Sequence, residues 1–224
     1  MDVGALTLDV TSFILSENHD GDITYAFPFA KIDSLGVVVL HKHRIEKIIN
    51  YVEDQLFSFI NCDDTCALIP NNITSYANEV SSAANNIFCD DEFINDACYV
   101  LCRVIAQTKK KDPNSSYWDE GLKIFLCGGG RNIDIYAKEL IGKAQTRLRA
   151  IGLKALTRED VPLPEKLEAP DLPASQFYRL AVAHGLSFPP YLIGDVYPPS
   201  AVDIIDPSNK DFILHDRFIS KELT

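Results

Sequence analysis

Two short clusters of residues combine carboxylates, hydroxyls and glycines in a way that could do chemistry. The first is the segment 2–9, Asp-Val-Gly-Ala-Leu-Thr-Leu-Asp, in which two carboxylates flank a glycine turn and a threonine. Such a turn presents backbone N–H groups and a hydroxyl to a phosphate, and paired carboxylates hold Mg²⁺, usually through its waters. Asp2, Gly4, Thr7 and Asp9 are therefore candidate phosphate and metal residues, and the alternative is a hairpin with an ordinary polar turn.

The second cluster is Cys127-Gly128-Gly129-Gly130-Arg131-Asn132, which follows an apolar run and precedes a helical pattern. Glycines allow a ligand to approach the backbone closely, and the start of a helix favours anions. The P-loop pattern and the dinucleotide-binding pattern G-x-G-x-x-G are both absent from the cluster. It is therefore a second candidate ligand site, and the alternative is a turn that serves packing.

Hydrophobic spacing and turn residues predict the elements that position these clusters. Residues 8–17 and 22–31 are typical of two antiparallel strands joined at Asp20-Gly21, a strong hairpin signal. Residues 122–126 are typical of a strand buried on both faces, which leads directly into the glycines. Apolar residues at spacings of three and four predict helices over 45–61, 133–152 and about 174–184, and residues 153–156 predict a further strand.

Two other regions are predicted to lie outside this frame. Residues 62–118 are interpreted as a mainly helical inserted subdomain: the first part is polar, and Phe93 to Val104 mark a helix that ends before Pro113. Nine of the twelve prolines lie after residue 161, which predicts an irregular segment at 162–173 and an extended tail at 189–224.

The order of the elements resembles the ATPase superfamily of actin and the seventy-kilodalton heat-shock proteins. The resemblance is carried by D-x-G-x-x-T-x-D-V at 2–10, by the apolar strand with its G-G-x turn and helix, and by 178–185, which resembles the family's closing helix. It covers residues 1 to about 188 and corresponds to the second half of the family's nucleotide-binding domain. It implies an α/β, ribonuclease-H-like fold with a mixed five-stranded sheet flanked by helices and a helical insert.

The resemblance also implies ligands and roles. ATP or ADP with Mg²⁺ is the implied ligand, with Asp2 and Asp9 near the metal and the attacking water, and Gly4 and Thr7 on the β- and γ-phosphates. The residues implied to pack against the α-phosphate and adenosine, or to border the base or ribose, are Gly128, Gly129, Gly130, Arg131 and Asn132.

Family members carry the rest of the cleft on a preceding, N-terminal half. That half is therefore an implied partner, and the parent is expected to be an Mg²⁺-dependent ATPase of the chaperone-like or actin-like kind. The present chain, for which Met1 is interpreted as an internal boundary, is expected to bind nucleotide weakly and to be inactive alone. A non-catalytic interaction or regulatory domain that keeps the fold and binds a protein partner is the alternative.

The overall composition argues against several other classes of function. The 224 residues include 21 basic and 32 acidic side chains, and the resulting charge of −11 disfavours nucleic acid or an anionic membrane as a partner. No apolar run is long enough to span a membrane, and the absence of a secretory signal predicts a cytoplasmic protein. The six cysteines are too sparse for a disulfide scaffold and are interpreted as reduced, mostly core thiols.

Three other patterns in the sequence are weaker than these candidates. Cys62 and Cys66 with His41 and His43 use residue types that zinc prefers, but the x₃ spacing is not typical of a zinc knuckle. A two-metal nuclease on a related fold would need a carboxylate at the end of the fourth strand, where the sequence has Cys-Gly-Gly. No nucleophile motif accompanies the remaining histidines, so a hydrolase triad is unsupported.

Overall fold

The structure is a computed structural model of the chain, and it describes residues 1–17, 21, 23–56, 90–164, 167, 173–189 and 193–202. At 48–56 and 174 only the backbone is described. Residues 57–89 lie outside the described residues, and with them the first part (62–89) of the insert predicted at 62–118, including Cys62 and Cys66. The end of the tail from 203 also lies outside them.

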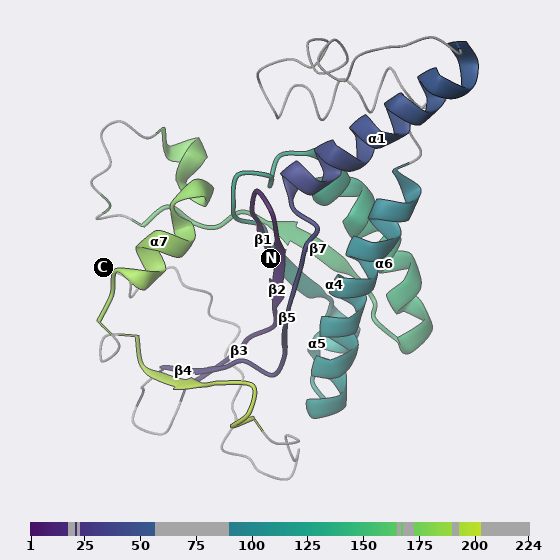
Figure 1. The fold of residues 1–224 in the computed structure, drawn as a ribbon. Coiled ribbons are helices and arrows are strands. Elements are labelled where there is room, and N and C mark those ends of the chain that lie inside the picture. Colours follow the sequence, from purple (N-terminus) through teal and green to yellow (C-terminus); the bar gives the residue numbers. More distant parts are fainter. Residues whose placement is uncertain are drawn as a thin grey trace.

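The described residues form a mixed α/β structure, as predicted (Figure 1). The strands are β1 (Asp2–Val3), β2 (Leu8–Thr11), β3 (Ile14–Glu17), β4 (Ile23–Ala26), β5 (Ala30–Asp33), β6 (Leu122–Phe125), β7 (Leu156–Glu159) and β8 (Asp195–Tyr197). The helices are α1 (Val37–Leu56), α4 (Asp91–Lys111), α5 (Tyr117–Glu120), the π-helix η1 (Ile135–Glu139), α6 (Leu140–Leu148), the 3₁₀-helices η2 (Arg149–Ile151) and η3 (Ala174–Arg179), and α7 (Ala181–Leu186).

Five strands lie side by side in the order β5-β2-β1-β6-β7. Strands β1, β2 and β5 pair antiparallel, whereas β6 and β7 pair parallel. The two groups meet at a parallel bridge between Asp2 and Cys127, where the Val3 N–H donates to the Cys127 carbonyl over 3.0 Å. This bridge places the end of β6, and the glycines that follow it, beside β1.

One face of these strands carries the hydrophobic core. Leu8 and Val10 of β2 are buried, while the alternate residues Asp9 and Thr11 point to the other face. Helix α4 packs against β2 and β5 and also against α6, and residues of α4, β2 and α6 contribute to a single cluster of buried side chains. Figure 1 shows α4 and α6 on one side of the strands and α7 on the other. Although α4 lies within the range 62–118 predicted as an insert, it is part of the main core.

The strand predictions for residues 8–17 and 22–31 need correction, because the chain forms four strands there instead of two. Each run breaks near its middle, at Ser12 and at Phe27-Pro28-Phe29. The Ser12 backbone N–H and side chain both donate to the Phe29 carbonyl, and the Ser12 hydroxyl accepts from the Phe29 N–H in place of a backbone carbonyl. Beyond the break, β3 and β4 form a separate small sheet with β8, which lies within the predicted tail.

Several other predicted boundaries were wrong. Helix α1 begins eight residues before the predicted start and is described as far as Leu56, so its predicted end at 61 lies outside the described residues. Strand β7 begins at Leu156, where the predicted strand ended. The strand β6 is not buried on both faces, because Lys123 is exposed. The predicted helix 133–152 divides into η1, α6 and η2, and the helix predicted at about 174–184 divides into η3 and α7. Helix α4 ends at Lys111, before Pro113, as predicted.

Among the described residues, no helix is both long enough and apolar enough to cross a membrane.

Candidate functional site

The two carboxylates of the first cluster lie opposite each other on neighbouring strands. Asp2 of β1 is the register partner of Asp9 of β2, so their side chains project from the same face of the sheet. Oxygen Oδ1 of each carboxylate is buried, and neither has a hydrogen-bond partner in the described part of the chain. Buried polar atoms normally have partners, so these two oxygens are candidates for contact with a bound ion or water.

The electrostatics of the pair favour a cation between the two carboxylates. Burial of the carboxyl and the charge of Asp9 raise the pKa of Asp2 above its ordinary value. A bound cation would reverse this effect by stabilising both ionised carboxylates. No group of three or more His, Cys, Asp or Glu that could hold a metal occurs among the described residues. Two carboxylates without further ligands fit Mg²⁺, which usually keeps several of its waters.

The loop between β1 and β2 turns its amides outward. The carbonyls of Gly4, Ala5 and Leu6 accept hydrogen bonds of 2.7–3.1 Å from the first N–H groups at the start of α1. Because the C=O and N–H of a trans peptide unit point in opposite directions, the N–H groups of residues 5–7 point away from α1. These three amides have no acceptor among the described residues. Such a group of unsatisfied amides forms a concave surface suited to an anion.

The hydroxyl of Thr7 links this loop to the carboxylates. Its Oγ1 donates to Oδ2 of Asp9 over 3.4 Å, a long hydrogen bond. The Gly4 N–H donates to the Thr7 carbonyl over 3.0 Å and closes the turn. The four residues predicted from the first cluster therefore lie together in one turn and its flanking strands.

The second cluster packs against the first. Gly128 has φ +83°, and a Cβ at this position would lie 2.1 Å from Asp2 Oδ1. A Cβ at Gly130 would lie 2.4 Å from a methyl group of Val3, whereas one at Gly129 would meet nothing within 4 Å. Gly128 and Gly130 are thus needed for packing beside β1, and Gly129 faces open space. The interpretation as a packing turn is therefore confirmed for Gly128 and Gly130, whereas the ligand site stays a prediction, for which Gly129 leaves space.

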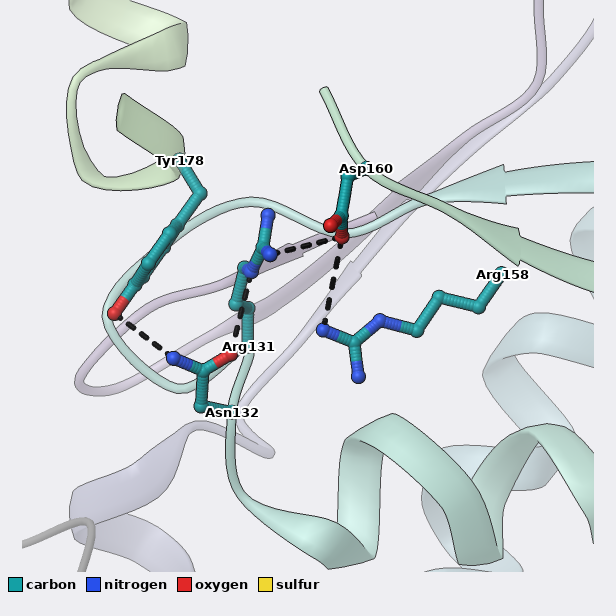
Figure 2. Close-up of polar contacts among 5 residues, drawn as sticks. All are labelled: Arg131, Asn132, Arg158, Asp160 and Tyr178. Atoms are coloured by element: carbon teal, nitrogen blue, oxygen red, sulfur yellow. Dashed lines mark hydrogen bonds and ion pairs between the residues drawn. The ribbon is translucent and has the colours of Figure 1, made fainter. Parts of the chain in front are cut away.

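Arg131 and Asn132 are held by side chains that follow later in the sequence (Figure 2). The Arg131 guanidinium lies 4.4 Å from the centre of the Tyr178 ring and donates to Asp160 over 2.8 Å. The Asn132 amide donates to the Tyr178 hydroxyl over 3.1 Å. Arg158 Nη2 lies 3.9 Å from the same Asp160 oxygen. The backbone joins this cluster too, because the Gly128 N–H donates to the Tyr178 carbonyl over 3.1 Å.

No family model and no curated protein matches the chain. The site is therefore interpreted from its own geometry.

Sequence reasoning missed two residues that shape the site. A Cβ on Gly36 would lie 2.5–2.6 Å from backbone atoms of residues 5–7, so only glycine lets α1 approach the loop so closely. Tyr178 was noted only within the run 178–185, whereas the structure places its ring against Arg131. The predicted helix begins only at residue 45, so the sequence gives no signal for Gly36, and the position of Tyr178 within the run 178–185 does not indicate its contact with Arg131.

Proposed function

We propose that this chain is the nucleotide-binding half of a chaperone-like or actin-like ATPase and that it takes ATP or ADP with Mg²⁺. The observation that carries the proposal is the Asp2 and Asp9 pair, with a buried, unpartnered oxygen on each carboxylate beside a loop of outward amides. Metal-bound phosphates require both features next to each other: carboxylates for the cation and backbone donors for the anion.

The strand order supports the finer fold assignment within this proposal. In the ribonuclease-H-like arrangement implied by the resemblance, three antiparallel strands are followed by two parallel ones on the other side of the first strand. The order β5-β2-β1-β6-β7, with its change of direction between β2 and β6, has this form. The same order brings the two glycine-containing loops to neighbouring strand ends.

Each group in the site has a proposed role. Asp2 and Asp9 hold Mg²⁺, directly or through its waters, while the amides of the β1–β2 loop and the Thr7 hydroxyl bind the β- and γ-phosphates. Mg²⁺ would supply charge neutralisation on the phosphate oxygens. Open space at Gly129 leaves room for the α-phosphate and adenosine, and Arg131 with Asn132 borders the base or ribose.

The proposed parent contains a second half that completes the cleft. Hydrolysis would require that half, so the chain alone is expected to show little turnover. Helix α7 has an exposed apolar surface suited to a protein contact, and Leu186 is 81% exposed. The proposed compartment is the cytoplasm.

A non-catalytic interaction domain with the same fold is the second candidate. The observation that favours it is the same exposed side of α7, where Val182 is exposed one helical turn before Leu186. In this case the unpartnered carboxylates would bind a cation without nucleotide, or nothing at all. Nucleotide affinity at the two loops distinguishes the two candidates.

The decisive experiment is isothermal titration of the folded chain with ATP and with ADP, each in the presence of Mg²⁺. Asp9→Asn and Gly129→Val should each weaken binding, the first by removing a metal ligand and the second by filling the open space. Asp119→Asn and Gly142→Val are the matched controls, since Asp119 is exposed and a Cβ at Gly142 also meets nothing within 4 Å. Equal affinity in all four variants, or no binding to the folded wild type, would favour the interaction domain.

A further inference from the structure

Asp160 is a carboxylate to which the roles proposed above assign no ligand. It comes directly after β7, and its side chain is 73% exposed. The Arg131 guanidinium donates to its Oδ1 over 2.8 Å, and Arg158 Nη2 lies 3.9 Å from the same oxygen (Figure 2). The other oxygen, Oδ2, has no hydrogen-bond or ion-pair partner within the described part of the chain. Asp160 therefore presents an unused acceptor oxygen to solvent.

The guanidinium that orients Asp160 is itself held on two sides. The Arg131 side chain is only 11% exposed, and it lies against the Tyr178 ring at 4.4 Å from the ring centre. Its Nε donates to Asn132 Oδ1 over 3.3 Å, and the Asn132 amide donates to the Tyr178 hydroxyl. These contacts fix the carboxylate before a ligand arrives, and such preorganisation lowers the entropic cost of binding.

The strand order places Asp160 in line with the two loops of the proposed site. Strands β1, β6 and β7 are parallel, so their carboxyl ends lie at the same end of the sheet, where open α/β sheets bind ligands. The register pairs Asp2 with Cys127 and Glu159 with Phe125, so Asp160 comes at nearly the same level as Asp2. Neighbouring strands lie about 4.8 Å apart, which puts β7 about 10 Å from β1, with the glycine loop between them.

We propose that Asp160 accepts hydrogen bonds from the ribose hydroxyls of the nucleotide, so that the site selects ribonucleotides over deoxyribonucleotides. This role rests on the proposed function, which puts the β- and γ-phosphates at the β1–β2 loop and the α-phosphate at Gly129. One strand further in the same direction, the ribose reaches the end of β7. A carboxylate is purely an acceptor, and the two ribose hydroxyls are donors. In dinucleotide-binding folds, an acidic residue about 20 positions after the glycine turn binds the ribose hydroxyl in this way.

The charge of Asp160 disfavours a phosphate in the same place. A phosphate would face the carboxylate, and like charges at contact distance repel. Arg131 and Arg158 would attract it, but both already face Oδ1 of Asp160. A neutral donor meets no such repulsion. Besides the ribose hydroxyls, the nucleotide offers the exocyclic amino group of adenine as a neutral donor, and the experiment separates these two.

The test is isothermal titration of the full-length chain with ATP, 2′-deoxy-ATP and 3′-deoxy-ATP, each with Mg²⁺. The wild type should bind ATP about tenfold more tightly than either analogue, as the loss of a hydrogen bond to a charged group predicts. Asp160→Ala should abolish this preference. The ratio of affinities is the readout because any general effect of the variant on nucleotide binding cancels in it. Glu159→Ala is the matched control, since Glu159 is the adjacent acid on the face of β7 opposite Arg158, and it should keep the preference.

The outcomes distinguish this role of Asp160 from nucleotide binding itself. Equal affinities for ATP and both analogues in the wild type, or a preference that persists in Asp160→Ala, would overturn the role while nucleotide binding stands. Absence of binding of any nucleotide to the folded chain would overturn both. Inosine triphosphate lacks the exocyclic amino group, so a preference for ATP over it that Asp160→Ala removes, with no preference over the deoxy analogues, would assign the carboxylate to the base instead. Fluorescence of the buried Trp118 checks that each variant is folded.

Discussion

Asp2 and Asp9 lie directly opposite each other across the β1–β2 pair, and each has a buried Oδ1 without a described partner. Two like charges at this spacing oppose each other, and burial adds to the effect. The free protein therefore bears an electrostatic cost that a cation would relieve. If the proposed Mg²⁺ binds here, ligand binding and folding stability depend on the same two side chains.

Replacement of Asp2 by Asn should stabilise the free protein at neutral pH while weakening its binding of Mg²⁺. The raised pKa of Asp2 means that the folded state binds this proton more tightly than the unfolded state does. Its contribution to stability is therefore fully present below the ordinary value of 3.8 and is lost as the pH rises through the raised pKa. Thermal unfolding between about pH 3 and pH 8 should show a flatter profile for Asp2→Asn. Added Mg²⁺ should raise the melting temperature of the wild type alone, and an equal rise in the variant would contradict the assignment.

Substitutions at the neighbouring residues Gly128 and Gly129 should differ sharply in their effect on the free energy of unfolding. Gly128→Ala places a Cβ in a left-handed conformation and 2.1 Å from Asp2, so we expect the free energy of unfolding to fall by about 2 kcal/mol or more. Gly129→Ala fills open space and should change it by no more than about 0.5 kcal/mol. Urea unfolding followed by Trp118 fluorescence measures both. Similar losses in the two variants would show that the loop is not packed as described.

Removal of one partner from the Arg44–Asp90 pair should be strongly destabilising. The Arg44 side chain is fully buried, and its Nη2 lies 2.6 Å from Asp90 Oδ2 while Nε donates to Oδ1 over 3.1 Å. Asp90→Ala leaves this guanidinium without its bidentate partner, at a cost of about 3–5 kcal/mol. The double variant Arg44→Met/Asp90→Ala should recover part of the loss. A loss below about 1 kcal/mol in the single variant would mean that solvent or another group compensates the charge.

Tyr178 should control how firmly the glycine loop is held. Its ring lies against Arg131, and its carbonyl accepts the Gly128 N–H. Tyr178→Ala removes the ring contact and the hydroxyl that accepts from Asn132, so the Gly128 amide should exchange faster with solvent. Tyr178→Phe keeps the ring and should have the smaller effect. Native-state hydrogen exchange distinguishes the two variants, and unchanged exchange in Tyr178→Ala would show that the backbone contact alone suffices.

The sequence predicted best where spacing alone decided the structure. The apolar residues of α4 have regular helical spacing, and they are buried together in the core. The prediction of element boundaries failed where a contact between residues far apart in the sequence determines the structure. Val37-Val38-Val39 is a β-branched run with low helix propensity, yet it begins α1, because its first amides find acceptors in the β1–β2 loop. The three consecutive buried residues of η1 fit a widened helix that a period of 3.6 does not predict.

The site shows the same division. The sequence identified Asp2, Asp9 and the glycines as candidates, because the residue type alone indicates what a carboxylate or a glycine at a turn can bind. It gave no indication that Asp2 lies beside Gly128, because the two are 126 positions apart and meet only through the bridge between β1 and β6. Gly36 and Tyr178 act through tertiary contacts, so their importance could not be inferred from local pattern.

The carbonyls of residues 4–6 in the β1–β2 loop accept hydrogen bonds from N–H groups at the start of α1. The donors that remain available to a ligand are the backbone N–H groups of residues 5–7. Recognition of the proposed ligand by the main chain would leave residues 5 and 6 almost interchangeable, since the side chains of Ala5 and Leu6 are exposed to solvent. Selection on such a site would act mainly to keep glycine at positions 36, 128 and 130, where a side chain would clash with neighbouring atoms. A binding surface of this kind can be retained while most of its residues are substituted. In a sequence it would be marked only by a few glycines and by two acidic residues seven positions apart.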